Sequence, residues 1–296
     1  MSLLKVLGFI VNHPLNREQK LRSIIRFVKW QIQSRLVPGV AIIDWINGSK
    51  FFAKKGEVGI TGNIYTGLHE FSDMGFLLHF LRDGDLFVDV GANVGSYTIL
   101  ACSAVGANGI AFEPVPSTYR RLVDNIQLNH LEKKVKCLNK GVGSNQGVVD
   151  FTSEENATNH ALSPSEECKN KVTVEITSLD SGLHGSDPSL IKIDVEGYES
   201  EVLEGAKKTL KNRKLNAVIM ELNGSGDRYG FDESQLLNLM ISNDFSPYTY
   251  DPFNRLLVNI EGKNTFSGNT LFIRNKAFVE ERLKTAPPIA IHGRQL

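Results

Sequence analysis

Cysteine is scarce in this chain of 296 residues, and its three cysteines form no recognisable pattern. Cys102, Cys137 and Cys168 lie far apart, and no C-x-x-C pair occurs. Their odd number argues against a disulfide framework, and their spacing argues against a zinc site with thiolate ligands. We therefore expect buried thiols without a metal or a disulfide.

An excess of positive charge is also lacking, since 33 lysines and arginines balance 33 aspartates and glutamates. Without a global positive field, no nucleic-acid partner is expected. No apolar run is long enough to span a bilayer, so no transmembrane segment is expected. The apolar residues 1–11 lack the basic leader and cleavage site of a secretion signal, and the expected compartment is the cytoplasm.

The most informative segment that is present reads LFVDVGANVGSYT, over residues 86–98. An apolar run, a glycine-containing turn and a helix start follow one another. Glycines let backbone N–H groups approach a ligand closely, and the N-terminus of the helix offers unpaired donors. The segment predicts a nucleotide-like cofactor. Its expected cofactor-binding residues are Asp89, Gly91, Ala92, Asn93 and Gly95.

The spacing of this segment favours one cofactor. A dinucleotide site requires G-x-G-x-x-G, whereas this chain reads D-x-G-A-N-x-G, so a pyrophosphate would fit poorly. S-adenosylmethionine has no phosphates, and Asp89 with the loop backbone could organise its amino-acid end. A second expected strand, within residues 109–114, ends in Glu113, whose two carboxylate oxygens suit a ribose diol.

Strands and helices alternate from residue 86 onward, which is typical of parallel βαβ units in an α/β fold. Seven core strands are expected, at residues 86–90, 109–113, 135–138, 190–194, 217–221, 245–250 and 270–273. Between residues 147 and 176, two alternating runs predict an inserted β-hairpin with a mobile tip. We divide the chain into an N-terminal extension (1–62), a core domain (63–275) and a C-terminal tail (276–296), which the pair Pro287-Pro288 suggests is loose.

The N-terminal extension is expected to contain a helix and a β-hairpin. Residues 17–36 place apolar side chains on one helix face among basic residues: Leu21, Ile24, Ile25, Val28 and Ile32. Such a helix could bind a membrane surface or a partner, but docking onto the core domain is the favoured interpretation. Asn47-Gly48 predicts the turn of the hairpin. The extension could also form the contact of a homodimer.

Five motifs in order resemble the FkbM family of S-adenosylmethionine-dependent methyltransferases: DVGANVGSYT, FEP, RLVDNIQLN, TSLD and IKIDVEGYE. The resemblance extends from Tyr65 to Ile273. It implies a Rossmann-like class I methyltransferase fold with a seven-stranded, mostly parallel sheet and helices on both faces. It also implies S-adenosylmethionine as the cofactor and O-methylation of a small molecule, a sugar or a glycan.

Catalytic candidates follow from the ligand crevice of an open parallel sheet, which lies beyond the carboxyl ends of the strands. Asp194 ends an apolar strand and could contact the methionine end of the cofactor or act as a base. Glu196 could act as a base or start the next helix, and the sequence favours neither role over the other. His160 is a further candidate base on the polar hairpin tip. Lys192 is expected to be a structural ion-pair residue.

The sequence leaves alternatives open on two questions: whether a metal ion binds, and which function the protein has. Asp194, Glu221 and Asn223 could hold a divalent cation that acidifies a substrate hydroxyl, although the preferred interpretation is a solvated strand end without a metal. A regulatory protein that binds the cofactor without catalysis would show binding but no turnover. A nicotinamide-dependent oxidoreductase is disfavoured by the glycine spacing, and calorimetry with each cofactor separates these two alternatives.

Overall fold

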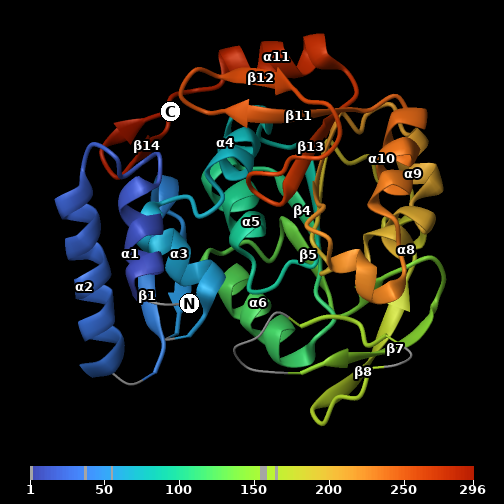
Figure 1. The fold of residues 1–296 in the computed structure, drawn as a ribbon, viewed down its shortest axis with the longest axis horizontal. Helices are drawn as coiled ribbons and strands as arrows, with labels where there is room; N and C mark the ends of the chain where they lie inside the picture. The colour runs from blue at the N-terminus through green and yellow to red at the C-terminus, as the bar shows by residue number, and fades with distance from the viewer. Residues whose placement is uncertain (1–2, 37–38, 55, 154–158, 164–165) are drawn as a thin grey trace.

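The computed structural model describes residues 3–36, 39–54, 56–153, 159–163 and 166–296. Its centre is an eight-stranded sheet with the order β12-β11-β13-β10-β9-β3-β4-β5 (Figure 1). The strands of this sheet are β3 (Leu86–Val90), β4 (Asn108–Phe112), β5 (Val135–Leu138), β9 (Leu190–Ile193), β10 (Ala217–Glu221), β11 (Ser246–Asp251), β12 (Leu256–Asn259) and β13 (Asn269–Ile273).

Neighbouring residues of each central strand pack on opposite faces of the sheet, as the alternation of side chains in a strand requires. Phe87 belongs to one apolar cluster and Val88 to the other. The first cluster includes residues of α4 (Phe71–Phe80), α5 (Ser96–Ile99), a π-helix (Leu100–Val105), α6 (Pro116–Leu128) and α11 (Lys276–Thr285). The second includes residues of α7 (Leu179–Gly182), α8 (Glu199–Glu204), α9 (Lys207–Lys211) and α10 (Glu233–Ser242). Both faces of the sheet are therefore covered, and the expected Rossmann-like α/β fold is confirmed.

The strand order reverses between β3 and β9. From β3 the chain builds outward through β4 to β5, and then it returns to place β9 on the other side of β3. β10, β9, β3, β4 and β5 are parallel, whereas β13, β11 and β12 add antiparallel pairs. A crevice for a ligand is expected at the carboxyl ends of β3 and β9, where the order reverses.

All seven expected core strands are present, and β12 is an eighth at the edge of the sheet. Its four residues, LLVN, have only one buried side chain, Leu257. Such a short segment gives almost no alternation signal. β12 pairs with β11 through the register Tyr250↔Leu257, so its strand state depends on its neighbour.

The inserted hairpin is confirmed as an antiparallel pair. β7 (Gly147–Thr152) pairs with β8 (Lys171–Thr177), and the short β6 (Gly141–Val142) extends the pair to three strands. Residues 154–158 and 164–165 of the expected mobile tip lie outside the described residues. Phe151, Val174 and Ile176 form a small apolar cluster with Val115, which attaches the hairpin to the core.

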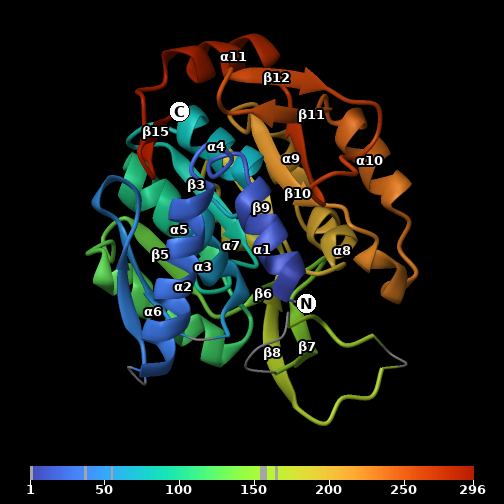
Figure 2. The same ribbon diagram turned by 60° about the vertical axis from the view of Figure 1, so that its left-hand side comes forward.

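The N-terminal extension contains two more helices than expected, and the last of them, α3, continues past the expected boundary at residue 62. Its elements are α1 (Leu3–Asn12), α2 (Lys20–Leu36), β1 (Ala41–Asp44), a 3-10 turn (Ile46–Gly48), β2 (Lys50–Ala53) and α3 (Val58–Thr66). Asn47 and Gly48 have φ values of 50° and 80°, which confirms the predicted left-handed turn between β1 and β2. Figure 2 shows α1 and α2 side by side on the outside of the molecule.

Helix α2 docks on the core domain through a different face from the one its aliphatic pattern predicts. Phe27 and Trp30 are buried and pack with Phe51 and Tyr65. The aliphatic residues that define the expected face are exposed instead: Leu21, Ile24, Ile25, Val28 and Ile32. The docking prediction is right, but the predicted face is wrong: Phe27 and Trp30 enter an aromatic cluster with Phe51 and Tyr65, and the helical period alone does not show which face has such partners.

The C-terminal residues are folded, so the expectation of a loose tail is wrong. Val279 and Leu283 of α11 are buried against the sheet, and β14 (Ala290–Ile291) pairs with β15 (Arg294–Gln295). The N–H of Leu296 donates to the carbonyl of Ile289. Pro287-Pro288 thus separates two packed elements and does not mark the start of a flexible segment.

Candidate functional site

A cavity of about 590 Å³ lies at the carboxyl ends of β3, β4, β9 and β10. This volume falls within the ~300–1,000 Å³ that small-molecule sites occupy. The cavity is lined by α3 of the extension and by the core domain together, and it contains the point where the strand order reverses. Its lining includes Asp89, Gly91, Glu113, Asp194, Glu196 and Glu221.

The glycine-containing loop after β3 is held by the neighbouring strand. The N–H groups of Gly91 and Ala92 both donate to the carbonyl of Phe112, at 3.0 and 2.9 Å. Asn93 has a φ of 50°, and Gly95, with a φ of 93°, caps the N-terminus of α5. These are left-handed conformations, which favour glycine and asparagine. The structure brings the predicted Gly91, Ala92 and Asn93 to the cavity, but Gly95 faces Leu122 and does not belong to the cavity lining.

Glu113 joins two loops at the end of β4. Its carboxylate accepts the N–H of Asn93 through Oε2 and the N–H of Val115 through Oε1, each at 3.0 Å. Burial raises the pKa of Glu113 to about 7, although these two backbone donors lower it in part. Each oxygen keeps a second lone pair, so the side chain can still accept hydrogen bonds from a diol in the cavity.

Asp89 is deeply buried at the end of β3, with 2% of its surface exposed. Its Oδ2 accepts a hydrogen bond from the Thr98 hydroxyl at 2.6 Å. Burial raises the pKa of Asp89 to about 6, and the bond from Thr98 and the charge of Lys192 partly oppose this shift. A carboxylate with one satisfied oxygen beside the loop can bind a cationic group that enters the cavity.

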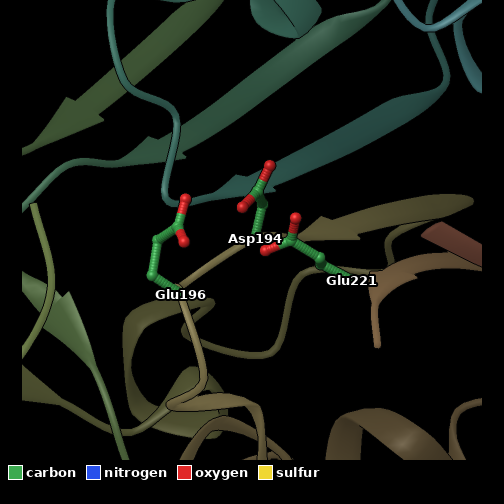
Figure 3. A group of neighbouring side chains, drawn as sticks. All are labelled: Asp194, Glu196 and Glu221. Atoms are coloured by element: carbon green, nitrogen blue, oxygen red, sulfur yellow. The ribbon is translucent and has the colours of Figure 1, made fainter. Parts of the chain in front are cut away.

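Three carboxylates converge in the same cavity, at the ends of β9 and β10. Asp194 and Glu196 follow β9, and Glu221 ends β10. Figure 3 shows the three side chains pointing toward one another, and each offers one carboxylate oxygen within 4.8 Å of the other two. Such proximity raises the cost of ionising all three groups together.

The pKa values of the cluster reflect burial first and mutual repulsion second. Burial, followed by the charges of Asp194 and Glu199, raises the pKa of Glu196 to about 7. Burial, followed by Asp194 and Glu196, raises the pKa of Glu221 to about 9. The Oε2 atom of Glu221 is buried and has no hydrogen-bond partner among the described residues. Burial and the neighbouring carboxylates therefore favour the protonated form of Glu221.

Lys192 supplies the positive charge beneath this cluster. Its side chain is only 1% exposed, and Nζ lies 2.9 Å from Asp194 Oδ2 and 3.3 Å from Asn269 Oδ1. Burial alone would lower the pKa of Lys192, but the carboxylates of Asp194 and Glu70 outweigh it and the net shift is upward. The ion pair that the sequence predicted for Lys192 is present, and its partner is Asp194.

Glu196 does not start the next helix, so that interpretation is wrong. Helix α8 begins at Glu199, and Glu199 and Glu201 occupy its first turn. Glu196 has a φ of 56°, which a helix cannot contain. The buried Glu199 accepts the N–H groups of Val195 and Gly197, and this holds the loop that points Glu196 into the cavity.

Two predicted residues lie elsewhere. The Nε2 atom of His160 lies 2.8 Å from Glu166 Oε1 on the inserted hairpin, and His160 does not belong to the cavity lining. Asn223 is exposed, and its Oδ1 accepts the N–H of Ser225. The acidic cluster thus contains Glu196 in the place where the sequence analysis put Asn223.

Tyr97 and Glu70 were not assigned as a pair from the sequence. Both line the cavity, and the Tyr97 hydroxyl donates to the Glu70 carboxylate. The ring of Tyr97 also lies 5.3 Å from Lys192 Nζ. Glu70 precedes α4 and Tyr97 lies in α5, so only the three-dimensional fold brings them together.

The reversal of strand order and the cavity beside it define a Rossmann-like α/β domain with a small-molecule site. Residues 89–247 match the family model described as the methyltransferase FkbM domain. The chain therefore belongs to the FkbM methyltransferase family, as its motifs indicated. The matched region contains the glycine loop, Glu113 and all three carboxylates of the cluster.

Two relatives and one solved structure illustrate these similarities. Hexuronic acid methyltransferase AglP of Haloferax volcanii is 33% identical over 154 residues, which cover 51% of this chain and 61% of that protein. Methyltransferase sdnD of Sordaria araneosa is 30% identical over 194 residues, which cover 53% of this chain and 74% of that protein. The structure of precorrin-6y C5,15-methyltransferase from Geobacter metallireducens superposes with a TM-score of 0.39 at 12% identity, covering 70% of this chain and 87% of that one.

Proposed function

We propose that this protein transfers a methyl group from S-adenosylmethionine to a hydroxyl group of a sugar or another small molecule. The observation that carries the proposal is one cavity lined by two chemically different groups of residues. The first group is Glu113 and the glycine loop, at the ends of β4 and β3, and the second group is the carboxylates of Asp194, Glu196 and Glu221, at the ends of β9 and β10. A cofactor bound by the first group would share the cavity with an acceptor bound by the second.

The first group, Glu113 and the glycine loop, fits S-adenosylmethionine. Glu113 keeps acceptor capacity for the two ribose hydroxyls, and the loop from Gly91 to Gly95 provides main chain for the amino-acid portion. Asp89 and Asp194 lie at the adjacent strand ends and can bind the ammonium group. The loop has no glycine at Ala92 or Asn93 to let a pyrophosphate approach its backbone, which disfavours a nicotinamide cofactor.

The second group, the three carboxylates, can remove a proton from an acceptor hydroxyl. The cofactor supplies an electrophilic methyl group; the acceptor oxygen forms the new C–O bond as the S–C bond breaks. We assign the proton of that hydroxyl to the Glu196 carboxylate, because its pKa of about 7 suits a base near neutral pH. Lys192 keeps Asp194 paired, and Asp194 can orient the hydroxyl. His160, beside Glu166, is assigned no proton transfer in this scheme.

A carbohydrate is the favoured acceptor class. The relative AglP is named for hexuronic acid, and the lining of the cavity is rich in polar and charged side chains. Sugars are recognised by such groups, because each hydroxyl both donates and accepts hydrogen bonds. Acceptor specificity is expected to depend on α3 and on the inserted hairpin, because both contribute to the cavity wall beside the carboxylates.

The experiment is methyl transfer from isotope-labelled S-adenosylmethionine to a panel of uronic acids, neutral sugars and small phenols, followed by mass spectrometry. We expect label on an oxygen of at least one carbohydrate, and loss of that label in the Asp194→Asn variant. Cofactor binding without transfer to any acceptor would favour a regulatory protein. Tight binding of a nicotinamide dinucleotide, with none of S-adenosylmethionine, would overturn the proposal.

A further inference from the structure

Helix α2 exposes an aliphatic stripe on the outside of the molecule. Its members recur at the spacing of one helix face and are Leu21, Ile24, Ile25, Val28, Ile32 and Leu36. Leu21, Ile25 and Ile32 are 72%, 56% and 52% exposed. We call this set the α2 stripe. Six large aliphatic side chains in one row are an unusual amount of contiguous apolar surface for a helix that faces water.

The α2 stripe is not needed to hold the helix in place. Phe27 and Trp30 project from the opposite face into the cluster that contains Phe51 and Ile60. The Nε2 of Gln31 also donates to the Tyr65 hydroxyl at 2.8 Å, and Arg26 donates to Asn16. Helix α2 is therefore anchored by one face, while the large aliphatic side chains of its other face are exposed in the described structure. Figure 2 shows this helix on the outside of the molecule.

The charges beside the stripe all have one sign. Helix α2 contains five basic residues and no acidic residue: Lys20, Arg22, Arg26, Lys29 and Arg35. Arg26 is half-buried on the anchored side of the helix, whereas the other four are exposed. Over residues 1–43 there are seven lysines and arginines and a single acidic residue, Glu18. Since the totals for the whole chain balance, the rest of the protein is net acidic. The segment that contains the stripe therefore has a net positive charge, unlike the rest of the chain.

We propose that α2 binds the surface of an anionic lipid bilayer. The α2 stripe would enter the boundary between headgroups and acyl chains, and the basic side chains beside it would contact lipid phosphates. Leu4 and Phe9 of α1 are exposed as well and enlarge the apolar area of the extension. None of the described helices is long and apolar enough to cross a membrane, and the proposal concerns binding at the surface alone.

Charge complementarity favours lipid over a second copy of this chain. In a two-fold dimer formed through α2, each stripe would cover the other, and the basic residues of both helices would lie close together. No acidic residue of α2 could compensate this repulsion. An anionic bilayer offers apolar volume and negative charge at the same surface.

The test is flotation of the full chain with lipid vesicles. Vesicles of phosphatidylcholine containing phosphatidylglycerol should carry the protein, those of phosphatidylcholine alone should not, and added salt should weaken binding. The double variant Ile25→Glu/Ile32→Glu should lower the bound-to-free ratio at least about tenfold. Ile241→Glu is the matched control, because Ile241 is an exposed isoleucine on α10, and it should bind like the wild type.

Folding and self-association are measured on the same samples. Thermal unfolding and S-adenosylhomocysteine binding should be unchanged in the double variant, because the stripe contacts neither the core nor the cavity. The proposal is overturned if the wild type does not float with anionic vesicles, or if the double variant floats equally well. It is also overturned if light scattering finds a wild-type dimer that the double variant dissociates, because the stripe is then covered by a second copy.

Discussion

Gly91 lies directly against the backbone of Asp194: a Cβ atom at position 91 would be 1.8 Å from the Asp194 carbonyl oxygen. The ends of β3 and β9 therefore meet main chain to main chain at the point where the strand order reverses. This contact brings the glycine loop and the carboxylate cluster into one cavity. Gly91 is required by the packing of the protein itself, in addition to any approach of a ligand.

The first prediction follows from this contact. Gly91→Ala should lower the free energy of unfolding more than Gly84→Ala does, because both glycines have a φ of 81° but only Gly91 faces a close neighbour. Conformational strain alone costs about 1–3 kcal/mol and is common to both variants. Chemical denaturation measures the difference. If both variants lost the same free energy of unfolding, the ends of β3 and β9 would be able to separate without an energetic cost.

The second prediction concerns Glu113. Glu113→Gln should weaken binding of S-adenosylhomocysteine by about 1.5–3 kcal/mol, because charge-assisted hydrogen bonds to the ribose are lost. Isothermal titration calorimetry measures the change. Glu204→Gln is the control, since Glu204 is an exposed glutamate whose partner is Lys207. An affinity equal to that of the wild type would remove Glu113 from the cofactor site.

The third prediction concerns the base. The pKa of Glu196 is about 7, so the rate of methyl transfer should rise with pH through that region as Glu196 loses its proton. Glu196→Gln should lower kcat by about two to four orders of magnitude and abolish this limb of the pH profile. The affinity for cofactor should not change. A variant that keeps both the rate and the pH profile would assign the base to another group.

The fourth prediction links Glu221 to stability. Its pKa is about 4.5 in the unfolded chain and about 9 in the folded protein, so folding favours the protonated form. This contribution to stability is fully present below pH 4.5 and is lost as the pH rises toward 9. Glu221→Gln keeps a neutral side chain at all pH values. Thermal unfolding should therefore show the variant gaining stability relative to the wild type from pH 5 to pH 9, and a constant difference would contradict the shift.

The fifth prediction concerns divalent cations. Lys192 already compensates Asp194, and burial favours the protonated form of Glu221, so the cluster carries little uncompensated charge without a metal. We expect methyl transfer to survive exhaustive chelation with EDTA. Loss of activity on chelation, with recovery on adding Mg²⁺, would instead assign a cation to the oxygens of Asp194, Glu196 and Glu221.

The parts of the fold that the sequence predicts well are those with strong local signals. The strands from Leu86–Val90 to Ala217–Glu221 are short, largely apolar runs, and the turn at Asn47-Gly48 needs left-handed residues. β12 depends on pairing with β11, and the docked face of α2 depends on packing against residues further along the chain, such as Phe51 and Tyr65; no local period reveals either. Periodicity finds a face of α2, but only packing decides which of its two apolar faces is covered.

The same distinction holds for the site. The end of a strand marks a residue as a candidate, and this rule places Asp89, Glu113, Asp194 and Glu221 at the cavity. The loop after β9 follows no such rule, because its course depends on Glu199, which accepts the N–H groups of Val195 and Gly197. For that reason the sequence left the role of Glu196 open.

The separation of charge between residues 1–43 and the rest of the chain gives a protein of zero formal net charge a large permanent dipole moment. A uniform electric field exerts no net force on a neutral molecule with such a dipole moment, but it does exert a torque. Near any strongly charged surface it should therefore rotate before it makes contact, and its rate of productive encounter should fall as ionic strength rises.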